Sequence, residues 1–173
     1  YNNRGVWKFE IKDFYGSIND YTKAIEIDLK DHIAYLNRGL TKKQIGDFEG
    51  AMKDINKAIE LEPQHHIVFY SRAIIKSQLK DFEGAINDLT KAIEIESHYA
   101  DAYNKRAKLK CDIYKDYYGA INDFSYVIKL NPDKYRGYYN RGVCKQFNQD
   151  AKGALKDYDK AIELVENSKN INL

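Results

Sequence analysis

Guanidinium and carboxylate side chains recur through the sequence at two fixed distances. Five of the six arginines follow one another at intervals of 34, 34, 34 and 35 residues: Arg4, Arg38, Arg72, Arg106 and Arg141. An aspartate follows each of them after 16 or 17 residues: Asp20, Asp54, Asp88, Asp123 and Asp157. A guanidinium can hold a carboxylate through two parallel hydrogen bonds, whereas an ammonium group cannot. The spacing therefore predicts a structural row of Arg–Asp ion pairs, with a ligand-binding row of arginines as the alternative.

The interval of about 34 residues indicates an internal repeat, and each repeat reads as two helices. In the second copy, apolar residues such as Leu36 and Leu40 recur at helical spacing over residues 32–45. Asp47 then stands where it can cap the next helix, which Pro63 ends. A helical hairpin of this length cannot bury its apolar faces alone, so we expect the copies to stack on one another.

Two further residue types keep their place in each repeat. The capping carboxylate recurs in all five copies as Asp13, Asp47, Asp81, Asp116 and Asp150. A glycine stands four residues before each paired aspartate: Gly16, Gly50, Gly84, Gly119 and Gly153. We expect these glycines to let a neighbouring helix approach closely, because they carry no side chain.

The repeat resembles the tetratricopeptide repeat (TPR). The resemblance rests on an aromatic residue in the first helix, a small residue four positions later and an alanine in the second helix. The aromatic residues are Tyr1, Tyr35, Phe69, Tyr103 and Tyr138. The small residues are Gly5, Gly39, Ala73, Ala107 and Gly142, and the second-helix positions are Ser17, Ala51, Ala85, Ala120 and Ala154. The sequence departs from the family pattern in two places, with Arg for the usual Leu and Lys for the usual Tyr.

The resemblance implies an all-α, right-handed superhelical solenoid of about five 34-residue helix-turn-helix repeats. We expect a single domain over residues 1–166, followed by a polar tail at 167–173. The expected repeats are 1–31, 32–65, 66–99, 100–134 and 135–166.

Resemblance to TPR proteins also implies that the first helices line a concave groove that binds a protein or peptide. The predicted groove residues are Asn3, Asn37, Tyr70, Ser71, Asn104, Lys105, Lys108, Tyr139 and Asn140. Asparagine offers a donor and an acceptor to a peptide backbone, and tyrosine is a large, rigid anchor. A protein–protein interaction scaffold is therefore the favoured function.

Two other functions stay open at this stage. The chain could be a regulatory or substrate-presenting arm of a larger enzyme. It could also bind nucleic acid, because lysines and tyrosines alternate around residues 105–118 of the irregular fourth copy. That second alternative is less favoured, since lysines on a helix more often face solvent and Asp112 and Asp116 dilute the charge.

The sequence contains no motif for catalysis, and we expect neither an enzyme nor a bound metal or cofactor. His65 and His66 are adjacent, but no cysteine or carboxylate cluster completes a metal site around them. Cys144 occupies a position that other copies fill with apolar residues or threonine, so we expect it to be buried.

Composition and charge limit the classes of partner that the chain can bind. The 173 residues carry a net charge of +2, too balanced to favour nucleic acid or an anionic membrane. No apolar run is long enough to span a membrane. No targeting signal is visible, and the cytoplasm is slightly favoured. The last helix leaves apolar residues such as Leu155 and Ile162 without a following repeat, so either more residues follow or this face meets another chain. We expect end-to-end self-association at high protein concentration.

Overall fold

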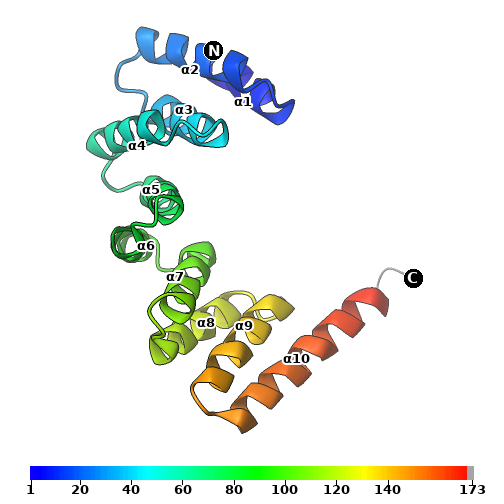
Figure 1. Cartoon of the computed structure of the whole chain (residues 1–173). Helices are drawn as coiled ribbons and strands as arrows, with labels where there is room; N and C mark the ends of the chain where they lie inside the picture. The colour runs from blue at the N-terminus through cyan, green and yellow to red at the C-terminus, as the bar shows by residue number, and fades with distance from the viewer. Residues whose placement is uncertain (171–173) are drawn as a thin grey trace. The chain divides into compact units, whose positions relative to one another are not determined.

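The protein folds as a series of helical hairpins. The computed structural model describes the backbone of residues 1–170 and the side chains of residues 1–168, and over that part it contains ten α-helices and no strand (Figure 1). Contacts between the helices divide the chain into two compact units, Tyr1–Ile95 and a second that begins at Glu96. The expectation of an all-α chain of repeated helix-turn-helix units is confirmed, while the single domain over residues 1–166 stays a prediction.

The first unit contains three hairpins, in which each first helix packs on the second helix of the same repeat. Its helices are α1 (Asn2–Glu10), α2 (Phe14–Ile27), α3 (His32–Gln44), α4 (Phe48–Leu61), α5 (His66–Gln78) and α6 (Phe82–Ile95). Within this unit α3 also packs on α2, and α5 on α4. The three hairpins lie inside the predicted repeats 1–31, 32–65 and 66–99.

The second unit contains two hairpins. Its helices are α7 (Ala100–Asp112), α8 (Tyr117–Leu130), α9 (Tyr135–Phe147) and α10 (Ala151–Asn170). Four residues, 113–116, join α7 to α8, whereas three residues join the two helices of each other hairpin. The extra residue of the fourth copy therefore lies in the turn, where it changes neither helix.

A carboxylate caps the second helix of every repeat. Asp13, Asp47, Asp81, Asp116 and Asp150 each accept a hydrogen bond, 2.8–2.9 Å long, from the backbone N–H of the glycine three residues later. Each bond satisfies one of the free N–H groups of the first turn. The residue before each aspartate has a positive φ, which closes the end of the preceding helix.

The five glycines after these caps have a different role from the one that the sequence suggested. A Cβ atom on Gly50 would collide with the capping carboxylate of Asp47, and the other four repeats show the same collision. The close approach between helices occurs instead at the small residue of the first helix. A Cβ atom on Gly39 would lie 3.1 Å from the carbonyl oxygen of Ala51 on the facing helix.

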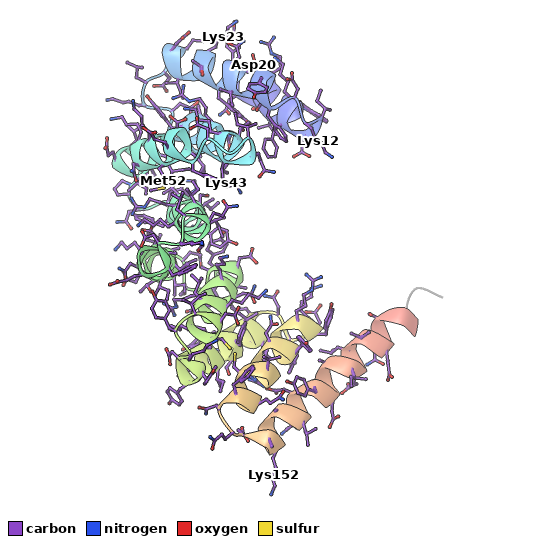
Figure 2. The ribbon with its side chains drawn as sticks, viewed as in Figure 1. Lys12, Asp20, Lys23, Lys43, Met52 and Lys152 are labelled. Carbon is purple, nitrogen blue, oxygen red and sulfur yellow. The ribbon has the colours of Figure 1, made fainter. Side chains whose placement is uncertain are left out.

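The core of each unit is formed where these small residues meet the second helices. In the first unit, Ala24, Ile25 and Ala34 form a buried cluster between α2 and α3. In the second unit, Phe124 packs with Ala107, Ala120 and two cysteines. Lysines such as Lys152 project away from the helices (Figure 2). Small residues at the crossings thus keep the helices close, and the larger apolar residues fill the layers between repeats.

The last helix is longer than predicted. It was expected to end near Glu166, but α10 continues to Asn170, because no proline or glycine follows Glu166 to stop it. Residues 167–170 of the predicted tail are therefore helical, and residues 171–173 lie outside the described part of the chain.

Candidate functional site

The repeating arginines and aspartates meet in all five repeats. In each pair the arginine Nε donates to aspartate Oδ2 at 2.7–2.9 Å and Nη2 donates to Oδ1 at 2.6–2.7 Å. The five aspartates are buried. Each guanidinium also lies over the ring of the aromatic residue three positions earlier, 5.3–5.9 Å from its centre. We call these five pairs the ion-pair row.

Each pair of the row includes a second cation that the sequence analysis did not assign. A lysine four residues after each arginine places Nζ 2.8–2.9 Å from Oδ2 of the same aspartate: Lys8, Lys42, Lys76, Lys110 and Lys145. Residues four apart share a face of a helix, so the spacing from arginine to lysine was the signal that could have revealed it. The lysine also lies in the last turn of the first helix, where a positive charge is favourable.

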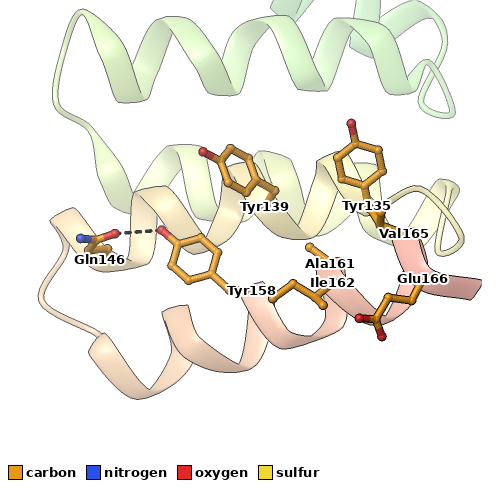
Figure 3. Close-up of a pocket in the computed structure, with 8 residues that line it drawn as sticks. All are labelled: Tyr135, Tyr139, Gln146, Tyr158, Ala161, Ile162, Val165 and Glu166. Atoms are coloured by element: carbon orange, nitrogen blue, oxygen red, sulfur yellow. Dashed lines mark hydrogen bonds between the residues drawn. The ribbon is translucent and has the colours of Figure 1, made fainter.

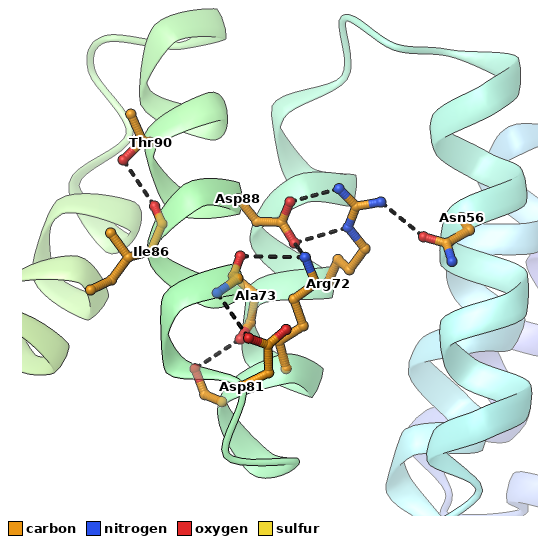
Figure 4. A network of polar contacts seen from close by, with 10 residues as sticks. Asn56, Arg72, Ala73, Asp81, Ile86, Asp88 and Thr90 are labelled. Carbon is orange, nitrogen blue, oxygen red and sulfur yellow. Dashed lines mark hydrogen bonds and ion pairs between the residues drawn. The ribbon is translucent and has the colours of Figure 1, made fainter. Parts of the chain in front are cut away.

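The third nitrogen of the guanidinium links neighbouring repeats. Nη1 of Arg72 donates to Oδ1 of Asn56 at 2.8 Å, which joins α5 to α4 (Figure 4). Nη1 of Arg38 likewise donates to Oγ1 of Thr22, at 3.1 Å, and Nη1 of Arg141 donates to Oγ of Ser125, at 3.0 Å. The acceptor always lies sixteen residues before the arginine. One arginine therefore holds its own hairpin together and ties it to the hairpin before it.

Hydrogen bonds from the two cations keep Asp20 and Asp157 ionised. The bonds from Arg4 and Lys8 outweigh desolvation and hold the pKa of Asp20 far below its usual range. At Asp157, burial alone would raise the pKa, but bonds from Arg141 and Lys145 outweigh it and lower the pKa. The ion pairs of Asp20 and Asp157 therefore stabilise the fold above the ordinary carboxyl pKa, and that stabilisation is lost as the pH falls through the lower pKa of the folded state.

The predicted groove residues of the first unit are only partly available to a ligand. Asn3 is exposed, and Asn37 donates from Nδ2 to Oδ1 of Asn2 at 3.2 Å. Tyr70 is half-buried. Ser71 is 4% exposed, so its hydroxyl is not presented at the surface. A side chain of two heavy atoms does not reach past its larger neighbours. The residue type alone did not reveal that Ser71 is buried.

In the second unit the structure brings three of the predicted groove residues together. Lys108 of α7, with Tyr139 and Asn140 of α9, lines two adjoining pockets of about 320 and 430 Å³. Tyr139 is 53% exposed, Lys108 is exposed and Asn140 is half-buried. Asn104 and Lys105 are half-buried on α7 and line neither pocket. Arg136, which was not predicted, lines the larger pocket.

The lysines and tyrosines that could suggest nucleic-acid binding are partly engaged within the fold. Lys110 binds Asp123, and Lys115 donates to the carbonyl of Asp112 at 2.7 Å. The ring of Tyr117 stacks on Phe147, with 5.6 Å between the ring centres. These contacts leave fewer cations and rings free for a nucleic acid than the sequence pattern suggests.

Histidines and cysteines were the remaining candidates for chemistry. His65 lies between His32 and His66, and burial, followed by the charges of those two rings, lowers its pKa. Burial raises the pKa of the Cys111 and Cys144 thiols, so both stay protonated and unreactive near neutral pH. Among the described residues, no three His, Cys, Asp or Glu side chains are grouped to hold a metal ion. No helix of residues 1–170 has the length and hydropathy to cross a membrane.

Comparison with known proteins places this architecture in a family. The tetratricopeptide repeat family matches residues 32–65, 68–99 and 135–167, which is more than half of the chain. The chain belongs to the tetratricopeptide repeat family. Membership in this family supports a role as a protein-interaction scaffold.

Solved structures agree with this assignment. A crystal structure of MamA is 26% identical, with a TM-score of 0.88, and the match covers 98% of this chain and 99% of that one. YrrB, described as a TPR protein with an unusual peptide-binding site, is 21% identical, with a TM-score of 0.77 over 95% of this chain and 84% of its own. MamA from Desulfovibrio magneticus is 17% identical, with a TM-score of 0.85 over 96% of this chain and 94% of its own. Among curated proteins, none matches the sequence.

Proposed function

We propose that this chain is a peptide-binding scaffold and that α7 and α9 form its binding surface in the second unit. The observation that carries the proposal is the convergence of Lys108, Tyr139 and Asn140 on two adjoining pockets. Lys108 comes from α7, Tyr139 and Asn140 are adjacent on α9, and each of the three lines both pockets. A ligand that fills one pocket would therefore contact the same three side chains as a ligand in the other.

The side chains define the chemistry of the peptide. The half-exposed ring of Tyr139 can pack on an apolar side chain. The amide of Asn140 can donate to and accept from a peptide backbone. Lys108 and Arg136 place two cations at the larger pocket, which favours a carboxylate on the ligand. The expected ligand is an extended segment with an apolar residue next to an acidic residue.

The family and its structures support this reading. YrrB, which shares the fold at 21% identity, is described as having a peptide-binding site. In the present chain the remaining predicted groove residues, Asn3, Asn37, Tyr70, Asn104 and Lys105, stay a prediction. A regulatory arm of a larger enzyme and a nucleic-acid-binding repeat also stay alternatives, and no contact among residues 1–168 favours either.

The proposal can be tested with a displayed library of random peptides selected on the immobilised 173-residue chain. Binding of selected peptides is then measured by fluorescence anisotropy for the native chain and for Tyr139→Ala and Lys108→Glu. We expect Tyr139→Ala to weaken binding about 30-fold, as loss of an aromatic anchor does. Lys108→Glu should weaken acidic peptides and spare neutral ones.

The matched control is Tyr118→Ala, which removes an exposed tyrosine from α8, outside the pockets. It should bind as the native chain does. If selected peptides bind equally well to the native chain, Tyr139→Ala and Lys108→Glu, the surface on α7 and α9 is not the binding site.

A further inference from the structure

In α1 one repeat position is exposed that is buried in the inner repeats. The residue three positions after each repeating arginine is buried at Thr41, Ile75 and Cys144. In the first repeat the same position holds Trp7, the single tryptophan of the chain, and its side chain is 73% exposed. A large aromatic residue therefore stands at the surface in the position where inner repeats contact the preceding hairpin.

The last hairpin has a complementary hollow. A pocket of about 700 Å³ opens between α9 and α10, and Tyr135, Tyr139, Tyr158 and Ile162 contribute to its lining (Figure 3). Ile162 is 56% exposed, whereas its equivalent on α2, Ile25, is 6% exposed because it packs with Ala34 of α3. The pocket on the last repeat therefore corresponds to the surface of the first repeat on which α3 packs.

The α1 face and the α9–α10 face also carry opposite charges at equivalent repeat positions. The inner arginines donate from Nη1 to Thr22, Asn56 and Ser125 on the second helix of the preceding repeat. The equivalent position on α10 holds Asp159, an exposed carboxylate for which the described part of the chain shows no ion pair. Arg4 is 58% exposed, and its hydrogen bonds use Nε and Nη2, both to Asp20. A cation and an anion thus occupy the two positions that would meet if one repeat followed the other.

We propose that the occupant of the α9–α10 pocket is α1 of a second copy of this chain. The second copy continues the repeat: its α1 corresponds to residues 36–44 of α3 and lies on α9 and α10 as that part of α3 lies on α2. Tyr1, at the position of Tyr35, packs on Ile162 as Tyr35 packs on the cluster that contains Ile25. Trp7 takes the position that Cys144 occupies near Phe124, and it packs on the equivalent residue, Tyr158. Arg4 of one copy donates from Nη1 to Asp159 of the other. Because the two faces differ, the contact is head-to-tail, and further copies can add to both ends.

The proposed association and the proposed peptide site share Tyr139, but they can be tested separately at residues that line only one of the two surfaces. Lys108 and Asn140 do not line the α9–α10 pocket, so Lys108→Glu should weaken the binding of acidic peptides without changing the oligomeric state. Failure of one proposal can therefore be distinguished from failure of the other.

Trp7 also provides the measurement. Sedimentation equilibrium and tryptophan emission are followed over a wide range of protein concentration, up to the millimolar. We expect the mass to rise with concentration and the emission to shift to shorter wavelength as the indole leaves water. Asp159→Arg should weaken the association at low salt and reduce its dependence on salt.

Two variants test the head-to-tail geometry. Trp7→Glu disrupts the α1 face, and Ile162→Glu disrupts the α9–α10 pocket. Both side chains are exposed, so the thermal unfolding of each variant at low protein concentration should match that of the native chain. Each variant alone should associate about 30-fold more weakly or stay monomeric. Mixed in equal amounts, they should form a 1:1 dimer that grows no further, because each partner supplies one intact face. Tyr118→Glu, at an equally exposed aromatic residue of α8, should associate as the native chain does.

Three outcomes would overturn the proposal. The first is a native chain that stays monomeric at every concentration. The second is Trp7→Glu that associates as strongly as the native chain, which would indicate a tail-to-tail contact. The third is a mixture of the two variants that remains monomeric although the native chain associates.

Discussion

The ion-pair row and the outer surface of the first helices lie side by side in the sequence but vary to different degrees. The Nη2–Oδ1 distance is 2.6–2.7 Å in every repeat, and the lysine contact is 2.8–2.9 Å. The residue directly before each arginine is less constant: it is asparagine in three repeats, the buried Ser71 in the third and Lys105 in the fourth. Buried charges allow one arrangement only, whereas neighbouring positions on the surface are free to specialise.

The difference separates what builds the repeat from what could recognise a partner. A buried carboxylate offers more acceptor sites than a guanidinium fills, and the lysine ammonium supplies a further donor to Oδ2. A surface residue loses few contacts when it changes. We therefore expect substitutions in the row to change stability, and substitutions on the surface to change binding.

The largest expected effect comes from removing a carboxylate from the row. In Asp54→Ala, Arg38 and Lys42 lose their shared partner, although their side chains are only 16% and 20% exposed. We expect a loss of about 3–5 kcal/mol in the free energy of unfolding, measured by urea denaturation. The control is Asp159→Ala, which removes an exposed carboxylate and should change the free energy by less than about 0.5 kcal/mol at low protein concentration. Equal effects in the two variants would contradict the distinction.

A smaller effect is expected when the arginine keeps its charge but loses its shape. Arg38→Lys removes the bidentate bond to Asp54, the bond to Thr22 and the contact with the ring of Tyr35. We expect a loss of about 1–2 kcal/mol, since a charged partner remains but the fork does not. The same change at exposed Arg136 should leave the urea midpoint unchanged. A stable Arg38→Lys variant would show that charge alone holds the row.

The caps should contribute less than the row. Asp47→Ala removes the acceptor for the backbone N–H of Gly50 at the start of α4. We expect a loss of about 1 kcal/mol in the free energy of unfolding. Asp47→Asn should recover most of this loss, because the amide oxygen can still accept the bond. If the asparagine variant were as unstable as the alanine variant, the carboxylate charge and not the hydrogen bond would be the stabilising feature.

The smallest effect is a pH dependence in the first unit. The pKa of His65 is lowered from its ordinary value of 6.5, so the fold favours the neutral ring. Its contribution to stability is complete above the ordinary pKa and is lost as the pH falls through the lower pKa of the folded state. Between pH 7.5 and pH 5.5, the native chain should therefore lose more stability than His65→Gln, as measured by urea midpoints. Parallel midpoints for the two chains would contradict a role for His65.

Much of the ion-pair row could be predicted because its signals are local and repeated. Arginine and aspartate recur in phase with the helices, and a guanidinium among many lysines points to a carboxylate. The lysine of each pair was visible at the same spacing, but its role depends on how the first helix turns toward the second. The caps were also predictable, since Asp47 and its equivalents precede each second helix.

The candidate binding surface was less predictable because it combines residues from neighbouring repeats. Lys108 and Tyr139 are far apart in the sequence, and only the packing of α9 beside α7 places them at the same pockets. Ser71 has the residue type of a groove position, but its side chain is buried. The role of Gly50 was misread for a similar reason, since the atom it avoids belongs to the cap and not to another helix.

The sequence by itself therefore determined the repeat, the helical hairpins and the partners of the ion-pair row, because periodicity, caps and charge pairing act within one repeat. The tertiary structure decided which small residues bring helices together and which polar residues reach the surface. These properties depend on side chains from separate hairpins, and their distances are set by packing rather than by spacing along the chain.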